Sequence, residues 1–108
     1  MAVNKNSVVN IAGYRFEPLF DPIDLVSVYQ QKCDELELKG TMLISKNGIN
    51  FSLAGTQKAT DTIIAFLEED NRFLNIPLKV TYSETQPFRR MKVRLKKEII
   101  SLGRKDIN

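Results

Sequence analysis

Two short strand-like runs joined at Asn47-Gly48 constrain the fold of this chain more than any other feature. Residues 41–45 form an apolar run before the junction, and in residues 49–54 large apolar side chains alternate with small or polar ones. Asn-Gly between two such runs is the strongest local signal for a β-hairpin, because both residues accept the backbone of a tight hairpin turn. The sequence therefore predicts a hairpin in the middle of the chain.

A helix pattern lies on each side of this hairpin. Before it, Asp21 is the expected cap of the free amides and Pro22 suits the first helical position, with an end before Gly40. After it, Thr56 is the expected cap of a second helix. Each predicted helix has one apolar face. The faces are formed by Val26, Tyr29, Cys33 and Leu36 in the first helix and by Ala59, Ile63, Phe66 and Leu67 in the second.

Three further segments have strand character. Residues 7–16 are β-branched and aromatic, while residues 78–83 and 90–96 alternate apolar with polar or charged side chains. The order is β-α-β-β-α-β with an added C-terminal basic strand, which predicts an α+β, ferredoxin-like fold. We expect an antiparallel sheet with both helices on one face and the other face open to solvent or a partner. Residues 1–108 are expected to form one domain, with 101–108 as the start of a linker.

Positive charge is concentrated at the end of the chain. Residues 1–88 carry 8 Lys or Arg and 11 Asp or Glu, whereas residues 89–108 carry 8 and 2. The first segment thus has a net charge of −3 and the second of +6. Such asymmetry is typical of proteins that contact nucleic acid.

The predicted basic strand is the candidate RNA-binding segment. Met91, Val93 and Leu95 would form its buried face, and alternate cations would lie about 6.6–6.8 Å apart on the other, where they could follow a phosphate backbone. An edge strand kept from aggregating by its charges is the alternative. Asn50 could add an amide for base or backbone recognition, or simply follow the turn. The candidate RNA-binding residues are Arg89, Arg90, Lys92, Arg94, Lys96, Lys97 and Asn50.

Three other side chains have a structural and a functional interpretation. Tyr14 and Phe16 could provide stacking surfaces for bases, but core packing is the favoured interpretation of both. Cys33 lies on an apolar helix stripe beside Asp34, so a buried structural thiol is favoured over a nucleophile.

Several classes of chemistry are excluded or unsupported by the sequence. The chain has no histidine and a single cysteine, so His-based acid–base chemistry and an internal disulfide are excluded. No signal peptide, membrane span, phosphate-binding glycine loop or metal-ligand cluster is recognised. We therefore expect a cytoplasmic domain with no catalytic residues, no metal and no cofactor of its own.

Three segments together carry a family resemblance. They are Gly48-Ile49-Asn50 after an apolar strand, the residues Phe16 and Asp21-Pro22 ahead of the first helix, and the run from Phe88 through Met91-Lys92-Val93-Arg94 to Ile100. In order and spacing they resemble the N-terminal region of the rhodanese-type tRNA-uridine hydroxylases, the YceA/TrhO family. The resemblance covers nearly the whole chain.

The resemblance implies a role in tRNA modification. Members of that family hydroxylate the wobble uridine of tRNA with oxygen, and the catalytic cysteine lies in a rhodanese domain that follows this region. Cys33 matches no part of that active loop. The implied role is therefore a non-catalytic domain that helps to bind tRNA. Packing on the rhodanese domain, or on a second copy of the chain as a homodimer, is the alternative.

The family region is also acylphosphatase-like, which implies the fold but not that activity. Acylphosphatases hold phosphate with an arginine in the loop between the first strand and first helix. The corresponding residues 17–21 contain no arginine or glycine, and Glu17 and Asp21 would repel phosphate.

Overall fold

The computed structural model of the chain describes residues 8–97. Five strands and two α-helices follow one another in the predicted order, and a 3-10 turn that was not predicted lies between α2 and β4. They are β1 (Val8–Phe16), α1 (Pro22–Glu35), β2 (Lys39–Ser45), β3 (Gly48–Gly55), α2 (Gln57–Glu68), η1 (Asn71–Phe73), β4 (Lys79–Ser83) and β5 (Met91–Leu95). No helix in this part of the chain is long and apolar enough to cross a membrane.

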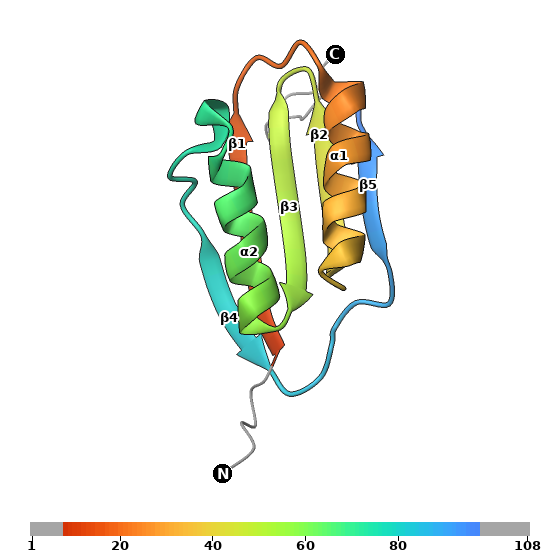
Figure 1. Ribbon diagram of the computed structural model, residues 1–108, viewed down its shortest axis with the longest axis vertical. Helices are drawn as coiled ribbons and strands as arrows, with labels where there is room; N and C mark the ends of the chain where they lie inside the picture. Colours follow the sequence, from red (N-terminus) through yellow and green to blue (C-terminus); the bar gives the residue numbers. More distant parts are fainter. Residues whose placement is uncertain (1–7, 98–108) are drawn as a thin grey trace, which may run out of the picture.

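The strands form one sheet in the order β4-β1-β3-β2-β5, and both helices cover the same face (Figure 1). The pairs among β1 to β4 are antiparallel, as predicted. The expectation of a wholly antiparallel sheet is wrong for β5, which pairs parallel to β2. The cause is the connection after β4, which crosses to the opposite edge so that β5 runs in the same direction as β2. The α+β, ferredoxin-like prediction with an added C-terminal strand is confirmed.

The core lies between the helices and the inner face of the sheet. Leu25, Tyr29 and Cys33 of α1 and Ile63 and Leu67 of α2 are buried against the sheet. The largest buried side chains on the strands come from β2 and β3 and alternate along each strand, as one-sided burial requires. They are Met42, Ile44, Ile49, Phe51 and Leu53.

The hairpin between β2 and β3 is confirmed, but its turn lies one residue earlier than predicted. Ser45 pairs with Gly48, so Lys46 and Asn47 form the connection. Gly48 has a φ of +143°, and a Cβ there would overlap the Arg15 carbonyl oxygen of β1. Glycine is therefore required at this position by the close approach of a neighbouring strand rather than by the turn.

The two expected helix caps have different outcomes. Thr56 accepts a hydrogen bond from the Ala59 amide at 3.0 Å and caps α2, as predicted. Asp21 precedes α1, but its side chain makes no capping hydrogen bond. The prediction of an Asp21 side-chain cap is wrong, because the carboxylate is bound to Arg72 instead.

Gln30 of α1 occupies the outer edge of the basic strand β5. Its side-chain oxygen accepts from the Val93 amide at 2.9 Å, and its side-chain nitrogen donates to the Met91 carbonyl at 3.2 Å. The amide side chain therefore pairs with β5 as a neighbouring strand would. Edge strands need such protection because their unpaired backbone groups invite other strands to bind.

Replacing Gln30 with Met should destabilise the domain by removing both of these bonds. We expect the free energy of unfolding to fall by about 1–2 kcal/mol, because each bond contributes about 0.5–1.5 kcal/mol. Urea denaturation measures the change as a lower midpoint with an unchanged slope. Gln31→Met, at an exposed neighbouring position, is the control; equal effects of the two changes would contradict a specific role for Gln30.

Candidate nucleic-acid interface on the open sheet face

The face of the sheet opposite the helices is the candidate site. Residues directly opposite each other on neighbouring strands share a face, so the strand register defines rows that cross the sheet. One row runs from Tyr14 through Asn50 and Leu43 to Arg94. The adjacent row consists of Lys79, Ala12, Ser52, Thr41 and Lys92. We call this surface the open face.

The open face is positive, and negative charge lies on the helix side. The five strands contain no Asp or Glu, and their open face carries Lys39, Lys79, Lys92 and Arg94. The helices carry acids instead. In residues 8–97, the cations with an ion-pair partner within 4 Å are Lys32 and Arg72, both from the helix layer. The charge split of the sequence is therefore also a split between two faces.

The structure brings together only some of the predicted RNA-binding residues. Lys92 and Arg94 lie on the open face of β5, and Asn50 lies exposed on central strand β3. Arg90 and Lys96 lie at the two ends of β5. The Gly40 amide donates to the Arg90 carbonyl, and the Lys96 amide donates to the Ile44 carbonyl, so both residues stay in line with the strand. Arg89 and Lys97 are exposed beyond these positions.

The predicted buried face of β5 is only partly buried. Val93 is buried and Met91 is half-buried, as expected. Leu95 is 50% exposed, because the last residue of the edge strand has few neighbours to cover it.

Tyr14 and Phe16 are exposed, which makes the favoured core interpretation of both residues wrong. They share the face of Asn50, whereas Val9 and Ile11 of the same strand point into the core. Both aromatic rings stand on the open face, 59% and 54% exposed, with centroids 5.3 Å apart. Sequence reasoning placed these two aromatics on the wrong side of the sheet.

Two adjoining hollows are present on this side of the sheet. The first, of about 390 Å³, lies between Tyr14 and Lys79 over the small residues Ala12 and Ser52. The second, of about 320 Å³, shares these small residues and Lys79 and is bordered by Pro87 and Phe88 of the β4–β5 connection. The open face is therefore uneven, with space for planar groups beside an aromatic ring.

The β1–α1 loop, which would be the phosphate cradle in an acylphosphatase, is hydrogen-bonded to the β2–β3 turn in this domain. The Glu17 amide donates to the Asn47 carbonyl at 3.0 Å, and the Leu19 amide donates to the Lys46 carbonyl at 2.8 Å. These two amides are therefore not free to bind an anion. The structure thus gives a second reason, besides the missing arginine, to expect no acylphosphatase activity.

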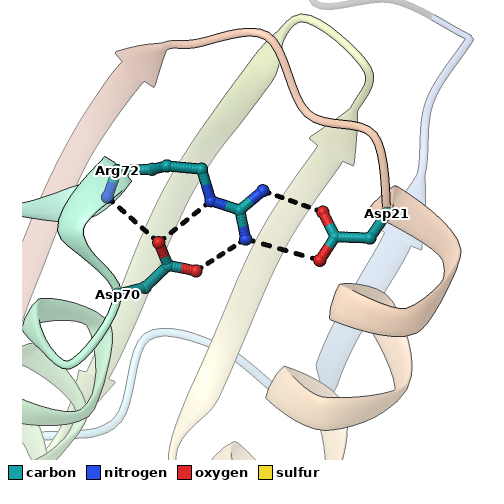
Figure 2. Close-up of polar contacts among 3 residues, drawn as sticks. All are labelled: Asp21, Asp70 and Arg72. Carbon is teal, nitrogen blue, oxygen red and sulfur yellow. Dashed lines mark hydrogen bonds and ion pairs between the residues drawn. The ribbon is translucent and has the colours of Figure 1, made fainter.

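Arg72 ties this loop to the end of α2 (Figure 2). Its guanidinium bonds Asp21 at 2.8 and 3.4 Å and Asp70 at 2.6 and 2.9 Å. It also lies over the Phe20 ring at 5.4 Å. Hydrogen bonds from Arg72 hold the pKa of Asp70 below its usual range. Asp70, two residues beyond the end of α2, is therefore paired with a cation.

Cys33 has the structural role predicted for it. It is fully buried in the core, and burial, with a smaller contribution from Asp34, raises the pKa of its thiol to about 12. A thiol in this state is a poor nucleophile, because the reactive form is the thiolate.

These features define a class of protein: a ferredoxin-like α+β domain whose open face is cationic and whose acylphosphatase-type loop is filled by internal bonds. The chain belongs to the UPF0176 acylphosphatase like domain family, whose sequence profile matches residues 8–99. The family predicted from the sequence resemblance is thereby confirmed.

Relatives of the chain are named tRNA uridine(34) hydroxylases. The protein from Cupriavidus metallidurans is 47% identical over 95 residues, which cover 88% of this chain and 34% of that protein. The protein from Bordetella avium is 44% identical over 97 residues, which cover 90% and 40%. The chain spans about a third of the length of the curated relatives it matches.

Solved structures of similar shape show the fold alone. The BLUF protein BlrB has a TM-score of 0.68 at 17% identity, over 87% of this chain and 75% of that one. Full-length HypF has a TM-score of 0.56 at 18% identity, over 90% of this chain and 13% of HypF. At such low identity, no activity is transferred from either protein.

Replacing Arg72 with Met should make folding less stable and less dependent on acid pH. The pKa of Asp70 is lowered in the folded state, so the ionised carboxylate contributes to folding stability. This contribution is complete above the unfolded pKa of about 3.9 and is lost as the pH falls from there through the lower pKa of the folded state. We expect the variant to lose about 1–3 kcal/mol at pH 7. We also expect a shallower decline in stability below about pH 4.

Urea unfolding from neutral pH down to about pH 2.5 measures both effects. Asp70→Asn is the matched control, since it removes the same titration while leaving the Asp21–Arg72 pair in place. A variant with the acid dependence of the wild type would contradict this role for Arg72.

Cys33 should react with a thiol reagent only when the protein opens. At pH 8 we expect slow labelling of the folded chain and rapid labelling in concentrated urea, because the buried thiol has a pKa of about 12. The time course of absorbance with a disulfide reagent measures both rates. Labelling of the folded protein at the unfolded rate would show that Cys33 is accessible.

Proposed function

We propose that this chain is the non-catalytic N-terminal domain of a tRNA uridine(34) hydroxylase and that its open face binds tRNA. The names of the relatives support the class of enzyme. In this proposal the oxidative chemistry belongs to a following rhodanese domain, and the protein acts in the cytoplasm on tRNA. The contribution of the present domain is affinity and placement of the substrate.

The observation that carries the tRNA-binding role is the separation of charge between the two faces. Lys92 and Arg94 lie on one face of β5, two residues apart along the strand, which corresponds to about 6.6–6.8 Å. Neither β5 nor its neighbouring strand β2 contains an acid, so no carboxylate of these strands competes with a phosphate. Cations that neutralise phosphates release counterions and supply affinity without sequence preference. Arg94 can also form bidentate contacts with phosphate oxygens.

An interdomain role for the same surface is the competing hypothesis. Leu95 is half exposed at the end of β5, next to the end of the domain where α1 begins (Figure 1). Ile23, near the start of α1, is 70% exposed. Apolar side chains of this kind beside a row of cations are typical of packing surfaces as well as of RNA-binding ones. A rhodanese domain, or a second copy of the chain, would then cover the basic strand.

Neutralising the basic strand should weaken tRNA binding and flatten its dependence on salt. For the double variant Lys92→Ala with Arg94→Ala, we expect the slope of log K against log salt to decrease in magnitude by about 1.4, since each phosphate contact contributes about 0.7 on single-stranded RNA. Fluorescence anisotropy with unmodified tRNA across a salt series measures the slope.

The matched control is the double variant Lys32→Ala with Lys58→Ala, which removes two cations from the helix side. It has the same net charge as the Lys92→Ala, Arg94→Ala variant. Equal losses in the two double variants would show that only net charge matters, which contradicts a binding face. If the wild-type chain fails to bind tRNA even at low salt, the proposal is wrong. Titration with a separately produced rhodanese domain and a measurement of molecular mass then test the interdomain and homodimer hypotheses.

A further inference from the structure

The aromatic pair Tyr14 and Phe16 on the open face has no role in the phosphate contacts proposed above. Tyr14 and Phe16 lie in the half of β1 that pairs with β3 alone, because β4 pairs with β1 only from Val8 to Ala12, and both rings are more than half exposed. Their ring planes are inclined at 52° to each other. Exposing two aromatic rings side by side forgoes the stabilisation that their burial would give. A ligand with flat apolar surfaces would restore it.

The surroundings of Tyr14 fit a planar polar ligand. The hollow of about 390 Å³ adjoins its ring, and small side chains such as Ala12 and Ser52 form the floor. Asn50 lies directly across from Tyr14 on β3 and is exposed. An amide side chain offers both a donor and an acceptor, as the edge of a nucleobase requires. Ring, space and amide are thus combined within two adjacent rows of the sheet.

We propose that Tyr14 and Phe16 form a stacking site for unpaired bases of single-stranded RNA, with Asn50 contacting a base edge. This inference rests on the proposed tRNA-binding function and specifies which part of an RNA the open face holds. Bases within a duplex are already stacked on both sides, so only unpaired bases can place a face on a protein ring. The site therefore selects loops or single-stranded ends over helical stems.

The position of the cations sets the length of the ligand. Tyr14 and Arg94 occupy opposite ends of a row that spans three strand spacings, which is about 14 Å. A base stacked on Tyr14 and a phosphate bound by Arg94 therefore belong to different nucleotides. The open face fits a run of several unpaired nucleotides rather than a single mononucleotide.

An apolar protein surface is the main alternative occupant of the aromatic pair. The charges favour RNA, because β1 and β3 contain no acid and Lys79 of β4 borders the hollow beside Tyr14. A protein partner would need matching carboxylates around an apolar centre. Single-stranded RNA supplies the anions and the flat rings in one chain.

The test compares two tyrosines with nearly equal exposure. Tyr14 is 59% exposed on the open face, and Tyr82 is 55% exposed on edge strand β4, opposite Val9 and so on the other face. We expect Tyr14→Ala to weaken binding of an oligouridine of about twelve nucleotides by about five- to 150-fold. Tyr14→Phe, which keeps the ring, and Tyr82→Ala should bind like the wild type. A duplex RNA of the same length should be insensitive to all three changes.

A fluorescence measurement reports stacking independently of affinity. The chain contains no tryptophan, so Tyr14→Trp introduces a single reporter, with Tyr82→Trp as its control. We expect bound oligouridine to quench the first reporter and leave the second unchanged. This readout remains informative if Tyr14→Ala is too unstable to study.

The outcomes separate this inference from the function on which it rests. Weaker binding by Tyr14→Ala, together with quenching at position 14, supports the stacking site. Salt-dependent tRNA binding that requires Lys92 and Arg94 but does not change with Tyr14→Ala would overturn the stacking site and leave the proposed function standing. Failure of the wild-type chain to bind either RNA would overturn both.

Discussion

Burial of a single face of the sheet is the constraint on which the rest of the structure depends. Both helices pack on the same side, so alternate residues of each strand divide between a dry core and an open surface. The central strand β3 shows this division clearly: Ile49, Phe51 and Leu53 are buried, whereas Asn50 and Ser52 are exposed. The same alternation places apolar residues of β5 inward and Lys92 and Arg94 outward. A shift of one residue in register would exchange the core with the open face.

The domain combines the frame of an acylphosphatase with a different use of its loop. Backbone amides that could face an anion instead bind the β2–β3 connection. Arg72 binds two carboxylates of the protein rather than a ligand. The charged groups at this end of the sheet therefore hold the loop in place. The open face on the opposite side of the sheet is not used in these contacts.

The sequence predicted most of the fold because the decisive signals are local. The hairpin, the two apolar helix faces and the Thr56 cap depend on residues within a few positions of one another. The Asp21 cap was predicted wrongly because its partner, Arg72, lies far away in the sequence. The turn was misplaced by one residue because the glycine at position 48 is required by the close approach of the Arg15 carbonyl oxygen, which belongs to another strand, and not by the turn.

The candidate site was predicted only in part. The basic strand was visible as a run of charge, but the placement of Arg94 in the same row as Asn50, two strands away, depends on the register of three strands. Tyr14 and Phe16 were misassigned because Gly13 and Arg15 interrupt the apolar row of β1. The ring of Phe51 approaches within 3.0 Å of the place where a side chain at Gly13 would begin. The ring of Phe51 thus fills the space that a side chain at Gly13 would occupy in the core, and the alternation of residues within β1 could not show this.

The crossing from β4 to β5 gives the open face two positive borders. Lys79 on β4 and Lys92 on β5 end the same row at opposite edges of the sheet, about 19 Å apart over four strand spacings. An anionic chain that contacts one border is held close to the other, so its second contact forms at a high effective concentration. Two weak attachments can then act together across the sheet.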